Sequence, residues 1–435
     1  PDMLHYGILP HAHRLWDWFF ERLETVVIDE VHEYRGVFGS HVSLVFRRLA
    51  RVCERFAEDG PASADGDPEY VCCSATIGNP VDHAANVTGR DPDSFVGIED
   101  DRSATGPRHW LLWNPPEYDD GGGRSTPESP DSDGADGAAD TGGSGRRRSS
   151  HVETKRLFVD LVARGYQTLA FTRARQTAER YATDSAADLR ERGEHDAAAS
   201  VAAYQGTLRN DRRREIESGL HDGSIRGVWS TNALELGVDV GELDAVLIDG
   251  YPGTRMSAFQ QAGRAGRGDD EALVILLGGE DQLDQYLLRH PEEFWEGDPE
   301  RAVCDPENEE LLPDHVASAA AENWLNTADD AHFGSQFASV VSDLTAAGRL
   351  DRRETDRGIR WLHDGDGSPQ HEMSLRTIER REIDLLDSRS NDVVASLSFA
   401  EALRDAHEGA IYHHQGQTYE GRTLDLDRDV ATLQP

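Results

Sequence analysis

The sequence has a single lysine, Lys155, and only four cysteines among its 435 residues. The cysteines show neither the spacing of a disulfide framework nor a Cys-x-x-Cys metal pair. No apolar run reaches the roughly 18 residues that a transmembrane helix needs, and no stretch has the pattern of a signal peptide. We therefore expect a cytoplasmic chain without a membrane partner.

Positive charge is also scarce. Lysine and arginine together number 44 against 82 acidic residues, which gives a net charge of −38. Such an excess repels phosphates and argues against a nucleic-acid partner at ordinary ionic strength. In multimolar salt the Debye length is about 3 Å or less, so that the repulsion is screened. We therefore expect a salt-loving source; the alternative is an acidic protein whose partner is not a nucleic acid.

The order of apolar runs predicts two α/β domains. Residues 1–116 and 151–290 each alternate short apolar strands with helical patterns, as parallel sheets with crossover helices do. Between them, residues 117–150 consist mainly of Gly, Ser, Asp, Pro and Ala and cannot bury enough apolar surface to fold, so we expect a disordered insertion. Residues 291–435 are more helical and polar, which predicts a mainly helical accessory region with a hairpin around Gly416.

Two adjacent carboxylates follow the first predicted strand, in the sequence VVIDEVH. Asp29 and Glu30 come at the carboxyl end of this strand, where parallel sheets bind their ligands. One carboxylate there can hold Mg²⁺ on a nucleotide. Its neighbour can orient and deprotonate the water that attacks the γ-phosphate. A solvated loop can have the same sequence, so the functional interpretation of this motif depends on the other motifs.

Two hydroxyl residues, Ser74 and Thr76, flank Ala75 at the end of the next predicted strand. Their side chains can hydrogen-bond the carboxylates and so transmit the state of the nucleotide. A bare Ser-Ala-Thr could equally cap a turn. Its position 44 residues after Glu30 is what favours a functional interpretation.

Arginines alternate with small residues in the sequence QQAGRAGRG. Arg264 and Arg267 lie three residues apart on one predicted helical face, and their small neighbours allow close approach to a polyphosphate. A guanidinium binds phosphate oxygens in pairs and can stabilise transition-state charge as an arginine finger. The alternative is a basic surface helix, although its three glycines would weaken a helix with no other task.

A polar strand end precedes these arginines in the sequence STNALELGVDVG. Thr231 and Asn232 offer groups that suit a sugar–phosphate backbone, Gly237 permits close approach, and Asp239 can meet an arginine or a ribose hydroxyl. An ordinary strand–turn–strand is the alternative. From Gln205 to Gly268, 8 arginines stand against 9 acidic residues, so this segment is nearly neutral within a very acidic chain.

In this order, DEVH, SAT, STNALELGVDVG and QQAGRAGRG resemble motifs II, III, V and VI of superfamily-2 helicases. LAFTRAR resembles motif IV, and the first five residues resemble the end of motif Ib. More narrowly, PDMLHYGILPH, EYRGVFGSHV, LLWNPP, QQAGRAGRG and HEGAIYHHQGQTY are similar to the MrfA/YprA-type helicases, relatives of the fungal Hrq helicase. The resemblance covers nearly the whole chain apart from 117–150. It implies two RecA-like parallel-sheet domains, the first incomplete, with ATP in the cleft between them, and a winged-helix-like part in the accessory region.

The resemblance also implies roles for single residues. In the first domain, Asp29 would coordinate Mg²⁺, Glu30 would activate water as the general base, and His32, Ser74 and Thr76 would couple hydrolysis to movement. The roles implied for the second domain are contact with ATP for Gln260, Arg264 and Arg267, contact with the nucleic-acid backbone for Thr172, Thr231 and Asn232, and a link between both sites for Gly237 and Asp239.

Two features of that family do not occur in these 435 residues. There is no Gly-x4-Gly-Lys-Ser/Thr loop, and Lys155 has no glycine cradle, so the lysine that holds the β- and γ-phosphates is absent. The cysteine-rich zinc-binding domain of the family is absent too, so zinc is expected only in such a domain.

We therefore expect an N- and C-terminally incomplete piece of an ATP-dependent DNA helicase, translocating 3′ to 5′ and linked to DNA repair, that does not hydrolyse ATP by itself. A non-hydrolysing nucleic-acid-binding module and an RNA helicase are the alternatives, because motor motifs that contact the backbone do not select the sugar.

Overall fold

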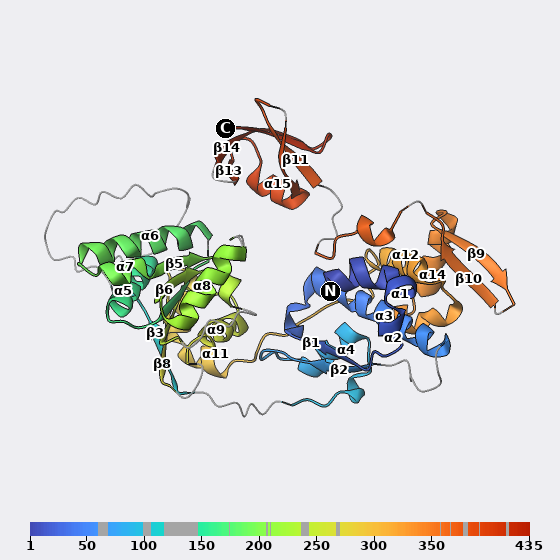
Figure 1. Cartoon of the computed structure of the whole chain (residues 1–435), viewed down its shortest axis with the longest axis horizontal. Coiled ribbons are helices and arrows are strands. Elements are labelled where there is room, and N and C mark those ends of the chain that lie inside the picture. The colour runs from blue at the N-terminus through green and yellow to red at the C-terminus, as the bar shows by residue number, and fades with distance from the viewer. Residues whose placement is uncertain are drawn as a thin grey trace. The chain divides into compact units, whose positions relative to one another are not determined.

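The chain divides into two compact units. Unit 1 comprises Pro1–Gly97 and Arg301–Pro435, and unit 2 comprises Ile98–Glu300. Figure 1 labels their helices and strands. The computed structural model describes residues 1–59, 68–98, 106–116, 147–173, 175–205, 208, 210–235, 243–266, 270–356, 358–365, 367–376, 382–390, 392–414 and 417–435.

Unit 2 is built on a six-stranded parallel sheet with the strand order β3-β8-β7-β4-β6-β5. The apolar runs of β4, β6 and β7 are buried along their whole length, because helices cover both faces of the sheet. The sheet confirms the predicted α/β class and is typical of a RecA-like domain. Its strands are β3 (Arg108–Trp113), β4 (Thr168–Phe171), β5 (Val201–Tyr204), β6 (Gly227–Ser230), β7 (Ala245–Asp249) and β8 (Ala272–Leu277).

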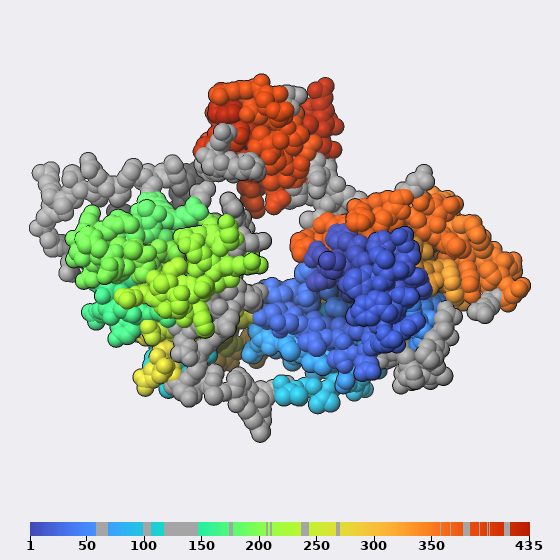
Figure 2. Space-filling view, in the orientation of Figure 1, coloured from blue at the N-terminus to red at the C-terminus, as the bar shows by residue number. Residues whose placement is uncertain are grey.

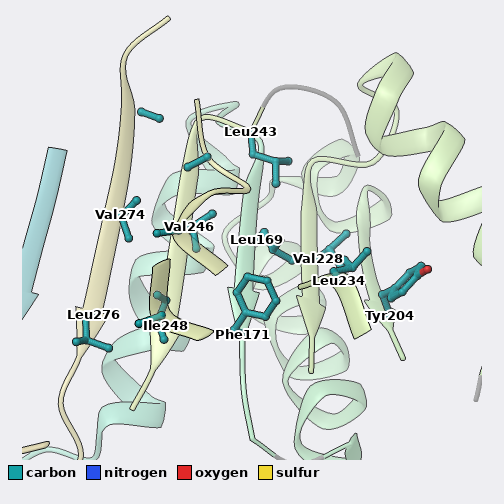
Figure 3. Packing of buried hydrophobic residues seen from close by; sticks show 14 of the residues in the cluster. Leu169, Phe171, Tyr204, Val228, Leu234, Leu243, Val246, Ile248, Val274 and Leu276 are labelled. Atoms are coloured by element: carbon teal, nitrogen blue, oxygen red, sulfur yellow. The ribbon is translucent and has the colours of Figure 1, made fainter. Parts of the chain in front are cut away.

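Alternate residues of each strand point to opposite faces of this sheet. Figure 3 shows the core on one face, where Leu169 and Phe171 of β4 lie near Val246 and Ile248 of β7. The other face carries the buried Trp229 of β6. The first face packs against α8 (Asn210–Asp222), α9 (Arg255–Ala262), α10 (Gln282–Arg289) and α11 (Pro291–Glu296), and the second against α5 (Ser150–Ala163), α6 (Arg175–Glu191) and α7 (His195–Ala199).

Two segments of unit 2 lie outside the range 151–290 that the sequence suggested for the second domain. Strand β3 pairs with β8, with Arg108 opposite Ala272, although it was expected in the first domain. Helix α11 packs into the core of unit 2 through the buried Phe294, although it was expected in the accessory region. A short apolar segment does not identify the sheet it joins by its own pattern. The predicted insertion 117–150 lies outside the described residues up to position 146.

The N-terminal part of unit 1 contains a two-stranded parallel sheet. Strands β1 and β2 pair with Ile28 opposite Cys72. The long helix α3 packs onto this core through Val42, Val45 and Leu49, which recur at helical spacing. The elements here are η1 (Leu4–Ile8), η2 (Leu9–His11), α1 (Ala12–Leu15), α2 (Asp17–Phe20), β1 (Thr25–Ile28), η3 (Val31–Glu33), α3 (Gly36–Asp59), β2 (Glu69–Cys72), α4 (Pro80–Thr88) and η4 (Pro92–Ser94).

Three helices and a hairpin follow in the C-terminal part of unit 1. Leu44 of α3 belongs to the same core cluster as Val316 and Phe337 of these helices, so the segment packs directly against the N-terminal part. The elements are α12 (Leu312–Glu322), η6 (Thr327–Asp329), α13 (Asp330–Phe333), α14 (Phe337–Ala346), β9 (Leu350–Thr355) and β10 (Gly358–His363).

The expectation of a mainly helical region over 291–435 was wrong for its last third. After η7 (Pro369–Glu372), a five-stranded sheet of order β12-β11-β15-β14-β13 packs against α15 (Phe399–Asp405). The expected hairpin near the end is present as the antiparallel pair β13–β14. Short strands with one exposed face, such as Val430–Gln434, show the period-two pattern over too few residues to outweigh the helical segments before them. The strands are β11 (Glu382–Asp387), β12 (Val393–Ser398), β13 (Ile411–His414), β14 (Gln417–Asp425) and β15 (Val430–Gln434).

A buried polar network connects three parts of unit 1 around Arg48 of α3. Figure 2 shows the N-terminal residues, in dark blue, beside the orange C-terminal ones. The guanidinium of Arg48 pairs with the buried carboxylate of Glu322 in α12. Its NH1 also lies 2.8 Å from Nδ1 of His5 and 3.3 Å from Nδ1 of His315. Because a guanidinium can only donate, both ring nitrogens must accept, and both histidines are neutral.

This network predicts that unit 1 loses stability in acid. Burial, together with the charge of Arg48, lowers the pKa of His5 to about 3. The unfolded chain, with a histidine pKa near 6.5, binds the proton first, so stability is complete above about pH 6.5 and falls as the pH drops toward 3. The loss is about 1.4 kcal/mol per pH unit for each such histidine. Unfolding measured from pH 7 to pH 4.5 should show this slope, and His5→Gln should reduce it; an unchanged slope in that variant would exclude His5 as a contributor.

Candidate nucleotide and nucleic-acid sites

The backbone turns sharply at the two carboxylates that follow β1. Glu30 has φ 50° and ψ 45°, the left-handed region that residues other than glycine rarely adopt. Its N–H donates to Oδ1 of Asp29 at 3.0 Å, and its carbonyl accepts from the N–H of Glu33 at 2.9 Å. Such strain is typically retained where function needs it. The turn leaves the Glu30 carboxylate partly exposed at the end of the sheet.

The Ser-Ala-Thr segment lies beside these carboxylates, because β1 and β2 are parallel neighbours. Its contact runs through His32, whose Nδ1 accepts the N–H of Ala75 at 3.0 Å and lies 3.4 Å from Oγ of Ser74. The same nitrogen lies 3.6 Å from the Glu30 carboxylate. Thr76 has an exposed side chain. The structure thus brings His32, Ser74 and Glu30 together, as the spacing suggested.

His32 is neutral in this arrangement. Its side chain is fully buried, and burial, together with Arg35 and His83, lowers its pKa to about 4. Because Nδ1 accepts from Ala75, the single ring proton resides on Nε2, which lies 3.5 Å from the carboxylate of Glu33. The short distance to Glu30 is therefore not an ion pair. His32 connects the two motifs and, being neutral, adds no positive charge beside Glu30.

In unit 2, helix α9 and Arg264 are both joined to the STNALEL segment through Glu235. Arg264 lies beyond the end of α9 at Ala262, so the helical face predicted for this arginine was wrong. Arg264 is buried, and its Nε donates to the Glu235 carbonyl at 3.2 Å. Gln261 donates through Nε2 to the Glu235 carboxylate at 3.0 Å. Thr254 precedes helix α9, and its side chain caps the helix by accepting the N–H of Ser257. Sequence reasoning named Gln260 and Arg264 here but missed Gln261 and Glu235, because their hydrogen bond joins residues 26 positions apart.

Four residues with expected roles stand on or beside these segments. Gln260 precedes Gln261 in α9 and is half-buried. Arg267, Gly237 and Asp239 lie outside the described residues, so their expected roles stay predictions.

Thr172 and Thr231 lie at the carboxyl ends of the neighbouring strands β4 and β6. The two strands are parallel, and the N–H of Thr172 donates to the carbonyl of Ser230 at 2.8 Å. Both threonine side chains are buried, whereas Asn232 is exposed. Thr172 also lines a cavity of about 460 Å³. The expected nucleic-acid residues therefore share one edge of the sheet.

The same edge carries a histidine–aspartate pair that sequence reasoning missed. Asp249 ends β7, and its buried carboxylate pairs with Nδ1 of His151, the second residue of α5. A signal was present: the run AVLID ends in a carboxylate just as VVID does. The two residues are 98 positions apart, so no spacing linked them.

In the described part of the chain, no group of three or more His, Cys, Asp or Glu could hold a metal ion. A single carboxylate still suits Mg²⁺, which keeps several waters and binds chiefly through the phosphates of its nucleotide. Asp29 is thus compatible with the expected role. None of the described helices is long and apolar enough to cross a membrane.

Comparisons with known proteins agree with the motifs. Residues 153–269 match the model of the helicase conserved C-terminal domain. The chain is 36% identical over 434 residues to the uncharacterized ATP-dependent helicase YprA of Bacillus subtilis, covering 99% of this chain and 52% of YprA. It is 30% identical to the ATP-dependent helicase HRQ1 of Saccharomyces cerevisiae, of which it covers 38%.

Solved structures show the same relationship. The DUF1998 helicase MrfA bound to DNA and AMPPNP has a TM-score of 0.75 and 35% identity, covering 100% of this chain and 55% of MrfA. A Mycobacterium smegmatis helicase Lhr, at 20% identity and TM-score 0.60, shares the fold. The chain thus spans about half, or less, of the helicases that it matches. It is related to the superfamily-2 helicases YprA, Hrq1 and MrfA, of whose full length it covers only a part.

Proposed function

We propose that this chain is the motor portion of an ATP-dependent DNA helicase or translocase. The observation that carries the proposal is the contact between the DEVH and SAT segments, in which a neutral His32 accepts the N–H of Ala75 and lies beside the partly exposed Glu30 carboxylate. A carboxylate that must accept a proton from water needs its charge and an open position. The similarity to MrfA bound to DNA and AMPPNP supports DNA and a nucleotide as the ligands of this chain.

Each expected residue has a role in this proposal. Asp29 holds Mg²⁺ through water or directly, which shields the phosphate charge when the ion is bound with ATP. Glu30 takes the proton of the attacking water. The coupling of ATP hydrolysis to movement is the role of His32, Ser74 and Thr76. In unit 2, ATP is bound by Gln260, Arg264 and Arg267. The DNA backbone is held by Thr172, Thr231 and Asn232. The ATP site and the DNA site are linked by Gly237 and Asp239.

Arg264 needs a rearrangement to reach a phosphate, because it is buried and bonded to the Glu235 carbonyl. Arg267 lies beyond the described residues, and we propose it as the arginine finger, since it follows Arg264 by three positions in the motif.

We further propose 3′-to-5′ movement, a role in DNA repair and a salt-loving, cytoplasmic source. The net charge of −38 and the single lysine support the last point. Binding to a polyanion in this charge state needs screening, so the proposal implies activity in multimolar salt.

This proposal predicts DNA binding without turnover for the chain as it stands. Because the 435 residues lack a phosphate-binding lysine loop, ATP hydrolysis should stay at background with or without DNA in about 2–3 M KCl. A version joined to such a loop should hydrolyse ATP, and single-stranded DNA should stimulate it more than RNA of the same sequence. Hydrolysis that never appears in the joined version would favour a non-hydrolysing binding module. Stronger stimulation by RNA would favour an RNA helicase.

A further inference from the structure

The chain passes between its two units twice, after Gly97 and after Glu300, and the two crossings differ. Beside the first crossing, the side chains of Val96 and Ile98 are almost completely exposed. After the second crossing, Ala302 is buried in unit 1, with only 3% of its surface exposed. The second crossing is therefore the one that is held in place where it enters unit 1.

Asn79 holds this crossing with both groups of its side-chain amide. Its Nδ2 donates to the carbonyl of Ala302 at 2.9 Å, and its Oδ1 accepts the N–H of Ala302 at 2.9 Å. Asn79 is also the N-cap residue of α4, where an asparagine usually accepts an N–H of its own helix, yet its side chain makes no such bond. The side chain thus serves the crossing and not the helix. Asn79 follows Thr76 of the SAT segment by only three positions.

The beginning of α3 holds the next residues of the same segment. The N–H of Gly36 donates to the carbonyl of Val303 at 2.7 Å, and the N–H of Asp305 donates to Oγ of Ser40 at 2.9 Å. Gly36 comes soon after the DEVH segment. The stretches that follow DEVH and SAT therefore bind the same piece of chain, directly after it enters unit 1.

Glu300, the last residue of unit 2, is held at the other end of the crossing by helix α9. Its carboxylate accepts the N–H of Arg255 at 2.5 Å and the N–H of Met256 at 3.2 Å. A carboxylate at this position satisfies free N–H groups and is favoured by the helix dipole. Helix α9 contains Gln260 and leads to Arg264. Glu300 therefore attaches the crossing to the helix that precedes the expected ATP contacts.

Only Arg301 stands between these two attachments. Because an extended residue spans about 3.5 Å, the Cα atoms of Glu300 and Ala302 are at most about 7 Å apart. The exposed pair of Arg301 with Asp82, at 3.7 Å, adds little. A link this short has almost no slack. A displacement of α9 must therefore move Ala302, or break one of the two attachments.

We propose that Asn79 and Glu300 are positioning residues, which couple the SAT segment to helix α9 through the link Glu300–Ala302. This inference rests on the proposed function, because it assigns how the state of the nucleotide at DEVH and SAT reaches unit 2. Neither side chain touches ATP or DNA in this assignment. Asn79 acts through the backbone of Ala302, and Glu300 acts through the first N–H groups of α9.

The test compares ATP hydrolysis with movement along DNA, in the version of the protein joined to a phosphate-binding loop. Movement is measured as the release of streptavidin from biotinylated single-stranded DNA, and its rate is divided by the rate of ATP hydrolysis. Asn79→Ala and Glu300→Ala should each lower this quotient about 10-fold, because each opens one end of the link. The double variant should lose no more than either single variant. A loss of folded protein lowers both rates alike and leaves the quotient unchanged.

Three further variants separate the link from other roles of these side chains. Serine caps a helix as well as asparagine does, but its hydroxyl is too short to reach both groups of Ala302, so Asn79→Ser should behave like Asn79→Ala. Asn86→Ala, at an exposed position of α4, and Glu296→Ala, at an exposed position of α11, are the matched controls. Both should keep the quotient of the unaltered protein.

Hydrogen exchange of the chain without the added loop gives an independent readout. In Asn79→Ala the amide of Ala302 should exchange about 10-fold faster, because its acceptor is gone, whereas the amides of α4 should be unchanged. Unchanged exchange at Ala302 would show that Asn79 does not hold the crossing, and would overturn the inference.

The inference and the proposed function fail in different ways. If the joined version hydrolyses ATP and moves, but both single variants keep its quotient, the coupling role is wrong while the proposed function stands. Losses that multiply in the double variant would show that the two residues act separately, which also overturns the link. A normal quotient in Asn79→Ser would assign Asn79 to helix capping. If the unaltered joined version neither hydrolyses ATP nor moves, the proposed function itself fails, and the inference fails with it.

Discussion

Replacing Glu30 by Gln should abolish DNA-stimulated ATP hydrolysis while ATP binding persists. The amide keeps the size of the side chain but cannot accept a proton from the attacking water. General-base catalysis is worth about 10²–10⁴-fold, and we expect a fall in kcat of this size. The measurement needs a version of the protein that carries a phosphate-binding loop together with this chain. Steady-state hydrolysis and equilibrium binding of a labelled, non-hydrolysable ATP analogue are then compared in the same salt.

Glu69→Gln provides the matched control for this variant. Glu69 is also exposed and in unit 1, but it begins β2 and so lies at the opposite end of the sheet from Glu30. We expect wild-type turnover for it. Full turnover in Glu30→Gln would remove Glu30 from its role. A joint loss of binding and turnover would instead indicate that the strained turn at Glu30 has collapsed.

The proximity of Glu30 and Ser74 was predictable from the sequence for a physical reason. Both follow short apolar strands, and parallel neighbours place their carboxyl ends at one edge. The neutral state of His32 was not predictable, because it depends on the N–H of Ala75, 43 residues away, and on burial among groups that no spacing identifies.

The buried charges of α3 were also invisible in the sequence. Arg48, Arg51 and Arg55 read as the solvent face of an amphipathic helix, yet all three are buried. Arg51 and Arg55 both bind Asp329, and Arg51 donates to the carbonyl of Ala319. The helical pattern of α3 marks the face with these arginines as polar. It could not reveal that residues after 310 pack against that face. The position of β3 in the sheet of unit 2 escaped prediction for another reason, because a short apolar strand does not identify the sheet that it joins.

Replacing Glu322 by Gln should destabilise unit 1 more than any surface substitution. Arg48 is completely buried, and the bidentate carboxylate of Glu322 compensates its charge. The variant leaves that charge with only neutral partners, His5, His315 and the new amide. Breaking a buried pair in this way costs about 3–5 kcal/mol, because an uncompensated cation stays in a medium of low polarity. Hydrogen exchange of the α3 and α12 amides reports this loss for unit 1 by itself.

Two further variants test whether the uncompensated charge of Arg48 causes the loss of stability in Glu322→Gln. Glu309→Gln makes the same change at an exposed position of unit 1 and should alter stability by less than about 0.5 kcal/mol. The double variant Arg48→Met with Glu322→Leu removes both charges and should recover much of the stability lost in Glu322→Gln, because an apolar replacement of a buried pair is often neutral. A double variant no more stable than the single one would show that the network acts through its hydrogen bonds to His5, His315 and Gln370. In that case the pairing of charges would not be what holds α3 to α12.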